Sequence, residues 1–216
     1  MRYAAAVAAL TLLGLAPSPV ASVTGLNGDA LLLRSAKLNP APLSYSVPLH
    51  FVARLHRPIS VRFRASAMTY FKAPDKQSLV ITSLPKLIRR HINSYYSDLD
   101  TIPQVWPAKY RVFSAIRTQV AGAATYHLDA TPKTAGSITH VTFDLLVNGL
   151  SPVGAEWYFQ DGSTVRLSIV NQRIGRYVLP QREDISIAMR GFSVDASCDP
   201  GTYAINAPIA DAVFAK

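Results

Sequence analysis

Residues 43–71 read LSYSVPLHFVARLHRPISVRFRASAMTYF, and this stretch decides the fold. On both sides of Pro58, apolar and polar residues alternate with a period of two, with Val52 as the exception. Such alternation is typical of strands that bury one face and expose the other. Pro58 marks the turn, so the sequence predicts a long β-hairpin. Its apolar face would carry Leu43, Tyr45, Val47, Leu49, Phe51, Ala53, Leu55, Ile59, Val61, Phe63, Ala65, Ala67, Thr69 and Phe71.

Two helical segments flank the hairpin. The first is predicted over residues 27–38, between an acidic capping position and a proline. A short strand over residues 79–82 precedes the second helix, over residues 84–96, where apolar residues recur every three or four positions and form one face. Residues 98–107, which include Trp106, are predicted to form a loop.

The rest of the chain reads as short strands separated by Gly, Pro and Asn breakers, Pro180 among them. These strands span residues 110–117, 124–129, 138–147, 156–160, 164–170, 176–179, 185–190, 192–197 and 203–206. A sheet of about twelve strands must curl or close, and two short helices can cover only part of it. Its inner face includes the small residues Ala53, Ala65, Ala67, Ala124 and Ala196. Such a sheet either admits a helix or leaves an apolar cavity, and an ordinary filled sandwich is the alternative.

The N-terminal segment has the layout of a secretory signal. Arg2 precedes an apolar run over residues 4–16, two prolines break that run, and small residues near Ser22 permit cleavage. The run is shorter than the roughly 20 residues that a membrane-spanning helix needs. We therefore expect a signal peptide over residues 1–22, a single domain over residues 23–216, and a periplasmic or secreted location. A buried N-terminal helix is the alternative.

The net charge of +9 is concentrated in one half of the chain. Residues 34–117 hold 14 basic and 3 acidic side chains, whereas residues 118–216 hold 7 and 9. The aromatic residues lie mostly on the apolar face, away from the basic ones, which argues against a nucleic-acid surface. We interpret the basic side chains as a docking face for an anionic envelope surface. Its members would be Arg62, Arg64, Lys86, Arg89 and Arg90.

Signals for catalysis and for metal binding are weak. The sequence has no Gly-x-Ser-x-Gly elbow and no glycine-rich phosphate loop. No two of its five histidines, and no histidine with Cys198, have the spacing of metal ligands. Cys198 is alone, so it forms no disulfide within the chain, and a buried thiol is expected. The sequence thus indicates neither an enzyme, a metal site nor a cofactor; an undetected hydrolase using His127, Asp129 and Ser151 is a weak alternative.

The hairpin and the run Tyr70-Phe71-Lys72-Ala73-Pro74 resemble the opening of the periplasmic lipoprotein-localisation carriers of the LolA and LolB type. The same opening occurs in outer-membrane lipoprotein-sorting proteins and cell-wall lipid carriers. Weaker similarity continues in residues 157–162, in residues 175–180 and around Tyr203. The resemblance implies a mainly β fold: a curved antiparallel sheet that forms an unclosed β-barrel, with two or three short helices as plug or lid.

One position departs from this pattern. In the lipoprotein carriers, an arginine precedes this proline and latches the lid. Here Ala73 occupies the position of that arginine. Arg62, Arg64 and Arg89 are the candidates to replace it. This departure counts against the specific prediction of lipoprotein transfer more than against the general prediction of a lipid-binding half-barrel.

The resemblance implies an exported, soluble, monomeric carrier that encloses acyl chains or a lipoprotein and meets partner proteins of the inner or outer membrane. Residues 84–96 would form the lid. The residues predicted to line the cavity are Leu49, Phe51, Phe63, Phe71, Leu87, Ile92, Trp106, Trp157 and Phe159. The alternative is a cell-envelope binding or scaffold module that has no open cavity and acts through its basic face.

Overall fold

The computed structural model describes residues 27–57, 60–83 and 101–215. The predicted signal peptide over residues 1–22 and the predicted lid helix over residues 84–96 lie outside this part. Among the described residues, none of the helices has the length and apolar character needed to cross a membrane.

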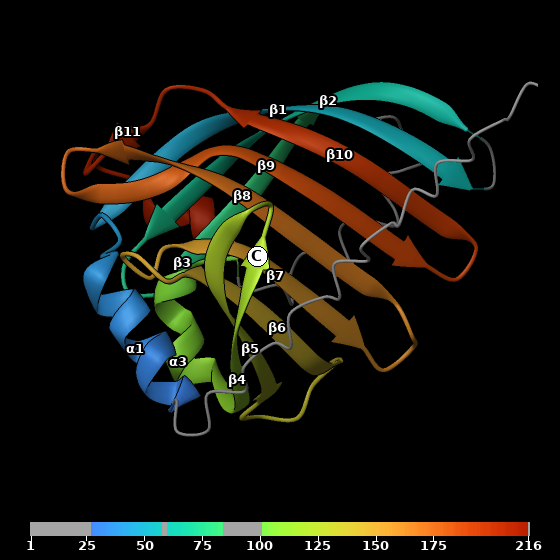
Figure 1. Cartoon of the computed structure of the whole chain (residues 1–216). Coiled ribbons are helices and arrows are strands. Elements are labelled where there is room, and N and C mark those ends of the chain that lie inside the picture. The colour runs from blue at the N-terminus through green and yellow to red at the C-terminus, as the bar shows by residue number, and fades with distance from the viewer. Residues whose placement is uncertain (1–26, 58–59, 84–100, 216) are drawn as a thin grey trace, which may run out of the picture.

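The described chain forms one large antiparallel sheet that curves around its apolar side (Figure 1). Its strands are β1 (Ser44–Arg57), β2 (Val61–Lys72), β3 (Lys76–Ser83), β4 (Tyr110–Val120), β5 (Ala123–Pro132), β6 (Ile138–Leu146), β7 (Pro152–Phe159), β8 (Thr164–Ile174), β9 (Tyr177–Met189), β10 (Phe192–Pro200) and β11 (Ala204–Ile205). The order is β3-β2-β1-β10-β9-β8-β7-β6-β5-β4, and β11 pairs with β1. In the described part, β3 and β4 are the two edges and do not pair with each other. The predicted mainly β, unclosed architecture is therefore confirmed.

The long hairpin forms as its period predicts. The strands β1 and β2 pair in one register from Leu55 opposite Val61 to Ser44 opposite Lys72. Alternate residues of β1 are buried, and Val52, which breaks the alternation, is exposed as expected. The prediction for Leu43 is wrong: its side chain is 72% exposed because β1 begins one residue later and the chain has not yet entered the sheet.

Two other predictions fail. We expected Pro180 to end a strand, but β9 runs through it without interruption. A register shift between Val170 and Asn171 of β8 lies opposite this proline and accommodates the missing backbone N–H. The carbonyl oxygen of Pro180 accepts hydrogen bonds from the Tyr203 hydroxyl at 2.9 Å and from Gln172 at 3.2 Å. The strand β9 thus crosses Pro180 at the register shift, where no ladder N–H is needed, and the Pro180 carbonyl oxygen finds two side-chain donors.

The predicted loop before β4 is also partly wrong, because it contains two short helices, η1 (Pro103–Val105) and α3 (Trp106–Lys109). The prediction of the first helix is confirmed as α1 (Gly28–Leu38), with Asn27 rather than an acidic residue as its cap. A last turn, η2 (Asp211–Phe214), contacts β3.

Helix α1 lies beside α3 and β4 at one end of the sheet (Figure 1). Polar contacts fix its position. The Asp29 carboxylate accepts a hydrogen bond from the backbone N–H of Val112 at 2.8 Å, and the Ser35 hydroxyl donates to the Leu150 carbonyl at 2.7 Å. At the other end of the helix, Asn39 donates to the Gly149 carbonyl at 3.0 Å. Both ends of α1 are therefore bound to the sheet.

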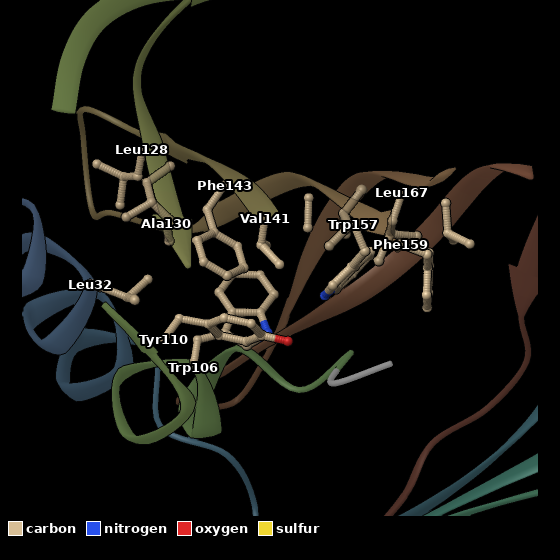
Figure 2. Close-up of a cluster of buried hydrophobic side chains, with 14 residues drawn as sticks. Leu32, Trp106, Tyr110, Leu128, Ala130, Val141, Phe143, Trp157, Phe159 and Leu167 are labelled. Carbon is tan, nitrogen blue, oxygen red and sulfur yellow. The ribbon is translucent and has the colours of Figure 1, made fainter. Parts of the chain in front are cut away.

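The main core lies where these helices meet β5 to β8 (Figure 2). The rings of Trp106 and Phe143 stack with centroids 4.2 Å apart, and Tyr110 meets the Phe143 ring edge-on at 5.3 Å. All three side chains are almost completely buried. Aromatic pairs of this geometry add to the free energy gained from burial. This cluster closes one half of the inner face of the sheet.

We expect Phe143→Ala to lower the free energy of unfolding by about 3–5 kcal/mol, because it removes a buried ring and leaves a void beneath Trp106. Urea denaturation followed by circular dichroism would measure the loss. Phe143→Leu keeps most of the volume and should cost under about 1.5 kcal/mol. Equal losses for both variants would show that the aromatic stack does not carry this core.

Candidate functional site: an apolar cavity in the curved sheet

The other half of the inner face encloses a cavity of about 210 Å³. It is bounded by β1, β2 and β3 on one side, by β7 to β10 on the other, and by residues 101–104. Its apolar lining includes Tyr45, Val47, Leu49, Phe51, Ala53, Phe63, Ala65, Ala67, Leu79, Ile81, Trp157, Val165, Leu167, Ile169, Ile185, Ile187, Val194, Ala196 and Tyr203. In other proteins, even smaller cavities lined by apolar side chains stay dry and bind apolar molecules.

Small side chains account for the empty space. Four of the five inward alanines predicted from the sequence, Ala53, Ala65, Ala67 and Ala196, line the cavity, whereas Ala124 does not. They lie on β1, β2 and β10, on the half of the sheet that α1 and α3 leave uncovered. Of the alternatives for this face, the structure shows a cavity over the half that carries the alanines and helical packing over the other half.

The cavity brings together four of the residues predicted to line it: Leu49, Phe51, Phe63 and Trp157. Three others are buried in side-chain packing away from its described lining: Phe71 packs against Tyr45 at a ring distance of 5.3 Å, and Trp106 and Phe159 belong to the main core. Leu87 and Ile92 lie outside the described residues.

The described lining has one ionisable carboxyl group, that of Glu183 on β9. Burial raises its pKa to about 7. Beside it, Cys198 on β10 is completely buried, as expected, and burial raises the pKa of its thiol. Burial also raises the pKa of the Tyr203 phenol. Sequence analysis did not identify Glu183 as a site residue, although it lies two positions before Ile185 and so shares the inward face of β9.

The predicted docking residues lie partly within the described chain. Arg62 and Arg64 are exposed on the outer face of β2, because they alternate with the cavity residues Phe63 and Ala65. This position turns them away from the cavity. Lys86, Arg89 and Arg90 lie outside the described residues.

The turn that carries Ala73 has ion pairs of its own. Ala73 is exposed, and the flanking Lys72 and Lys76 bind Asp211 of η2 at 3.0 and 3.2 Å. In place of an arginine at position 73, two lysines thus hold the C-terminal turn against the β2–β3 hairpin.

Two of the three residues of the weak hydrolase alternative lie close together, with His127 Nε2 3.9 Å from Asp129 Oδ1, whereas Ser151 is engaged elsewhere. The His127 imidazole pairs with Asp144 at 2.8 Å, and this hydrogen bond raises its pKa. Asp129 lies 3.4 Å from His140, whereas the Ser151 hydroxyl donates to Asn39 at 3.0 Å. Within residues 27–57, 60–83 and 101–215, no cluster of three or more His, Cys, Asp or Glu side chains is arranged to hold a metal ion.

No protein-family model and no curated protein sequence matches the chain. Solved structures do share its fold. A protein from Vibrio parahaemolyticus described as an outer-membrane lipoprotein-sorting protein domain superposes with a TM-score of 0.65 at 12% identity, over 87% of this chain and 95% of that one. A DUF1329-family protein from Desulfovibrio piger superposes with a TM-score of 0.62 at 13% identity, over 87% of this chain and 95% of that one. A LolA superfamily protein from Nitrosomonas europaea superposes with a TM-score of 0.60 at 13% identity, over 88% of this chain and 98% of that one. The resemblance predicted from the hairpin is therefore confirmed at the level of the fold.

The raised pKa of Glu183 predicts a pH-dependent stability. Between the usual value of 4.5 and the folded value of about 7, the folded chain retains a proton that the unfolded chain has lost, so stability falls as the pH rises through this range. Glu183→Gln removes this loss. We expect it to raise the free energy of unfolding at pH 8 by about 3 kcal/mol and to have little effect at pH 4. Urea denaturation across this pH range would measure it.

Asp184 provides the matched control, since it neighbours Glu183 but lies on the outer face. Hydrogen bonds from Ser197 and Arg182 lower its pKa, so its carboxylate stabilises the folded chain at neutral pH. Asp184→Asn should therefore lower stability at pH 8, and this loss should disappear as the pH falls below the usual Asp range. If Glu183→Gln also lowered stability at pH 8, as expected for Asp184→Asn, the raised pKa of Glu183 would be refuted.

Proposed function

We propose that the protein is an exported carrier that binds acyl chains of a lipid or lipoprotein in the cavity and transfers them across the cell envelope. The observation that carries this proposal is the apolar cavity on the inner face of the sheet. Two structures of the same fold support it, one described as an outer-membrane lipoprotein-sorting protein domain and one as a LolA superfamily protein. The signal-like sequence over residues 1–22 fits a periplasmic location.

The driving force would be the removal of apolar surface from water, which stabilises binding by about 0.8 kcal/mol for each buried CH₂ group. This requires no covalent step, cofactor or metal, and the carrier would not act as an enzyme. Leu49, Phe51, Phe63 and Trp157 would contact the ligand. Leu87 and Ile92, on the predicted lid over residues 84–96, would cover it and meet a partner membrane when the lid opens.

Docking would use the outer face of the hairpin. Arg62 and Arg64 are exposed there, and within the described chain neither forms an ion pair, whereas Arg166 and Arg182 on the same sheet pair with Glu156 and Asp184. Uncompensated arginines suit an anionic envelope surface. The same face supports the alternative of an envelope binding module, which differs in making no use of the cavity.

A substitution that fills the cavity tests the carrier directly. Ala67 lies on the inner face of β2, so Ala67→Phe would place a ring in the space the acyl chain needs. We expect the affinity for a fluorescent fatty-acyl probe to fall at least about tenfold. Ala188→Phe makes the same change at an exposed position of β9 and should leave the affinity unchanged. Fluorescence titration of the wild type and both variants would measure this.

Extraction of the protein purified without detergent, followed by mass spectrometry, supplies an independent readout, and co-purified lipid is expected. A wild-type protein that carries no lipid and binds no acyl probe would rule out the carrier proposal. Equal probe affinity in the wild type and Ala67→Phe would show that the probe binds elsewhere.

Salt should distinguish docking to a charged surface from binding in the cavity, because only docking depends on exposed charges. We expect R62E/R64E to abolish most binding to vesicles containing phosphatidylglycerol, and wild-type binding to weaken steeply between low salt and 1 M salt, because exposed charges are screened. Acyl-probe affinity should change little in both cases. The matched control is R111E/R117E, which makes the same charge change on exposed residues of β4. Vesicle co-sedimentation would measure the binding, and equal loss in both double variants would show a non-specific charge effect.

A further inference from the structure

An acidic side chain lies on the wall of the otherwise apolar cavity. Glu183 shares the inward face of β9 with Ile185 and Ile187, and all three line the cavity. Its neighbours across the sheet are Ile169 on β8 and Cys198 on β10. An ionised carboxylate in such surroundings is costly unless an opposite charge or hydrogen-bond donors compensate it.

The described chain supplies no such compensation. Within residues 27–57, 60–83 and 101–215, the Glu183 carboxyl has no hydrogen bond or ion pair, and the described lining contains no Lys, Arg or His. The nearby Tyr203 hydroxyl already donates to the Pro180 carbonyl. By contrast, Asp184 on the outer face is bound by Ser197 and Arg182. Within the described residues, the outer carboxylate is thus paired, whereas the inner one faces the cavity without a partner.

We propose that Glu183 selects a ligand whose apolar chain carries a protonated amine, with the ammonium group donating a charge-assisted hydrogen bond to the Glu183 carboxylate. This inference rests on the proposed acyl-chain cavity and adds the chemistry of the group bound beside the chain. Among common amphiphile head groups, an ammonium supplies both the charge and the donors that the carboxylate lacks.

Other head groups fit less well. A carboxylate or phosphate next to Glu183 would place two like charges together in an apolar surrounding, where their repulsion is poorly screened. A hydroxyl could donate one hydrogen bond but would leave the negative charge uncompensated. The raised pKa of Glu183 supports the same preference, because an ammonium partner would relieve the unfavourable burial that raises it.

The test compares three probes with the same apolar chain: dodecylamine, dodecanol and dodecanoate. Their affinities are measured by displacement of a bound fluorescent acyl probe at pH 8, where the Glu183 carboxylate is mainly ionised. Below their aggregation concentrations, the wild type should bind dodecylamine at least about tenfold more tightly than dodecanoate, with dodecanol in between.

Glu183→Gln keeps the size and polarity of the side chain and removes the charge. In this variant the preference for dodecylamine over dodecanoate should shrink to about threefold or less, while the dodecanol affinity should change less than about threefold. Asp184→Asn removes one negative charge from the outer face of the same strand, and it should keep the wild-type preference.

The outcomes separate the two proposals. If the wild type binds all three probes about equally, or if Glu183→Gln retains the amine preference, the assignment of Glu183 is overturned and the acyl-chain cavity stands. If Asp184→Asn loses the preference as well, a general charge effect replaces the proposed contact. If the wild type binds none of the probes, the carrier proposal itself fails, and this inference fails with it.

Discussion

Each strand of this sheet turns an apolar face inward, and that face must be buried against something other than water. The helices of the described chain are too short to cover it all. Trp106, Tyr110 and Phe143, together with α1, close the half formed by β4 to β6, and their aromatic stacking fixes the helices there. The other half has alanines in its inner face and retains a cavity of about 210 Å³. The division of one apolar face into a filled half and an open half underlies the rest of the structure.

The same division separates the close-packed core from the proposed binding site. The filled half is an ordinary close-packed core, where aromatic rings bury large areas and the polar contacts of α1 secure both of its ends. The open half keeps its shape because β1 is paired with β2 from Ser44 to Leu55 and with β10 from Leu49 to Arg57. Backbone hydrogen bonds to both neighbouring strands hold β1 in place where small side chains line the wall. The proposed carrier function would need this combination, since a ligand must enter a space that the fold does not need to fill.

Much of the fold could be predicted from local pattern. The period of two located both strands of the hairpin, and leucines between a capping position and a proline located α1, because each signal depends on neighbours along the chain. Pro180 misled the prediction, since its effect on β9 depends on the register shift in β8 and on Tyr203, which are distant in sequence. The candidate site was predicted in part: four of its lining residues were identified, whereas Phe71, Trp106 and Phe159 are buried away from the described lining. Burial can be predicted from a strand pattern, but which buried residue faces a space cannot.

The sequence by itself determined which side of each strand is apolar, where the hairpin turns, and that small residues gather on the inner face of β1, β2 and β10. It also determined the concentration of positive charge in the first half of the chain. Only the tertiary structure decided which half of the sheet the helices cover, and therefore where the cavity lies. Only it placed Glu183 in that cavity with no partner among the described residues, and gave its neighbour Asp184 two partners. The physical reason is that periodicity along a strand fixes the direction of a side chain, whereas its surroundings are supplied by strands and helices that are distant in sequence.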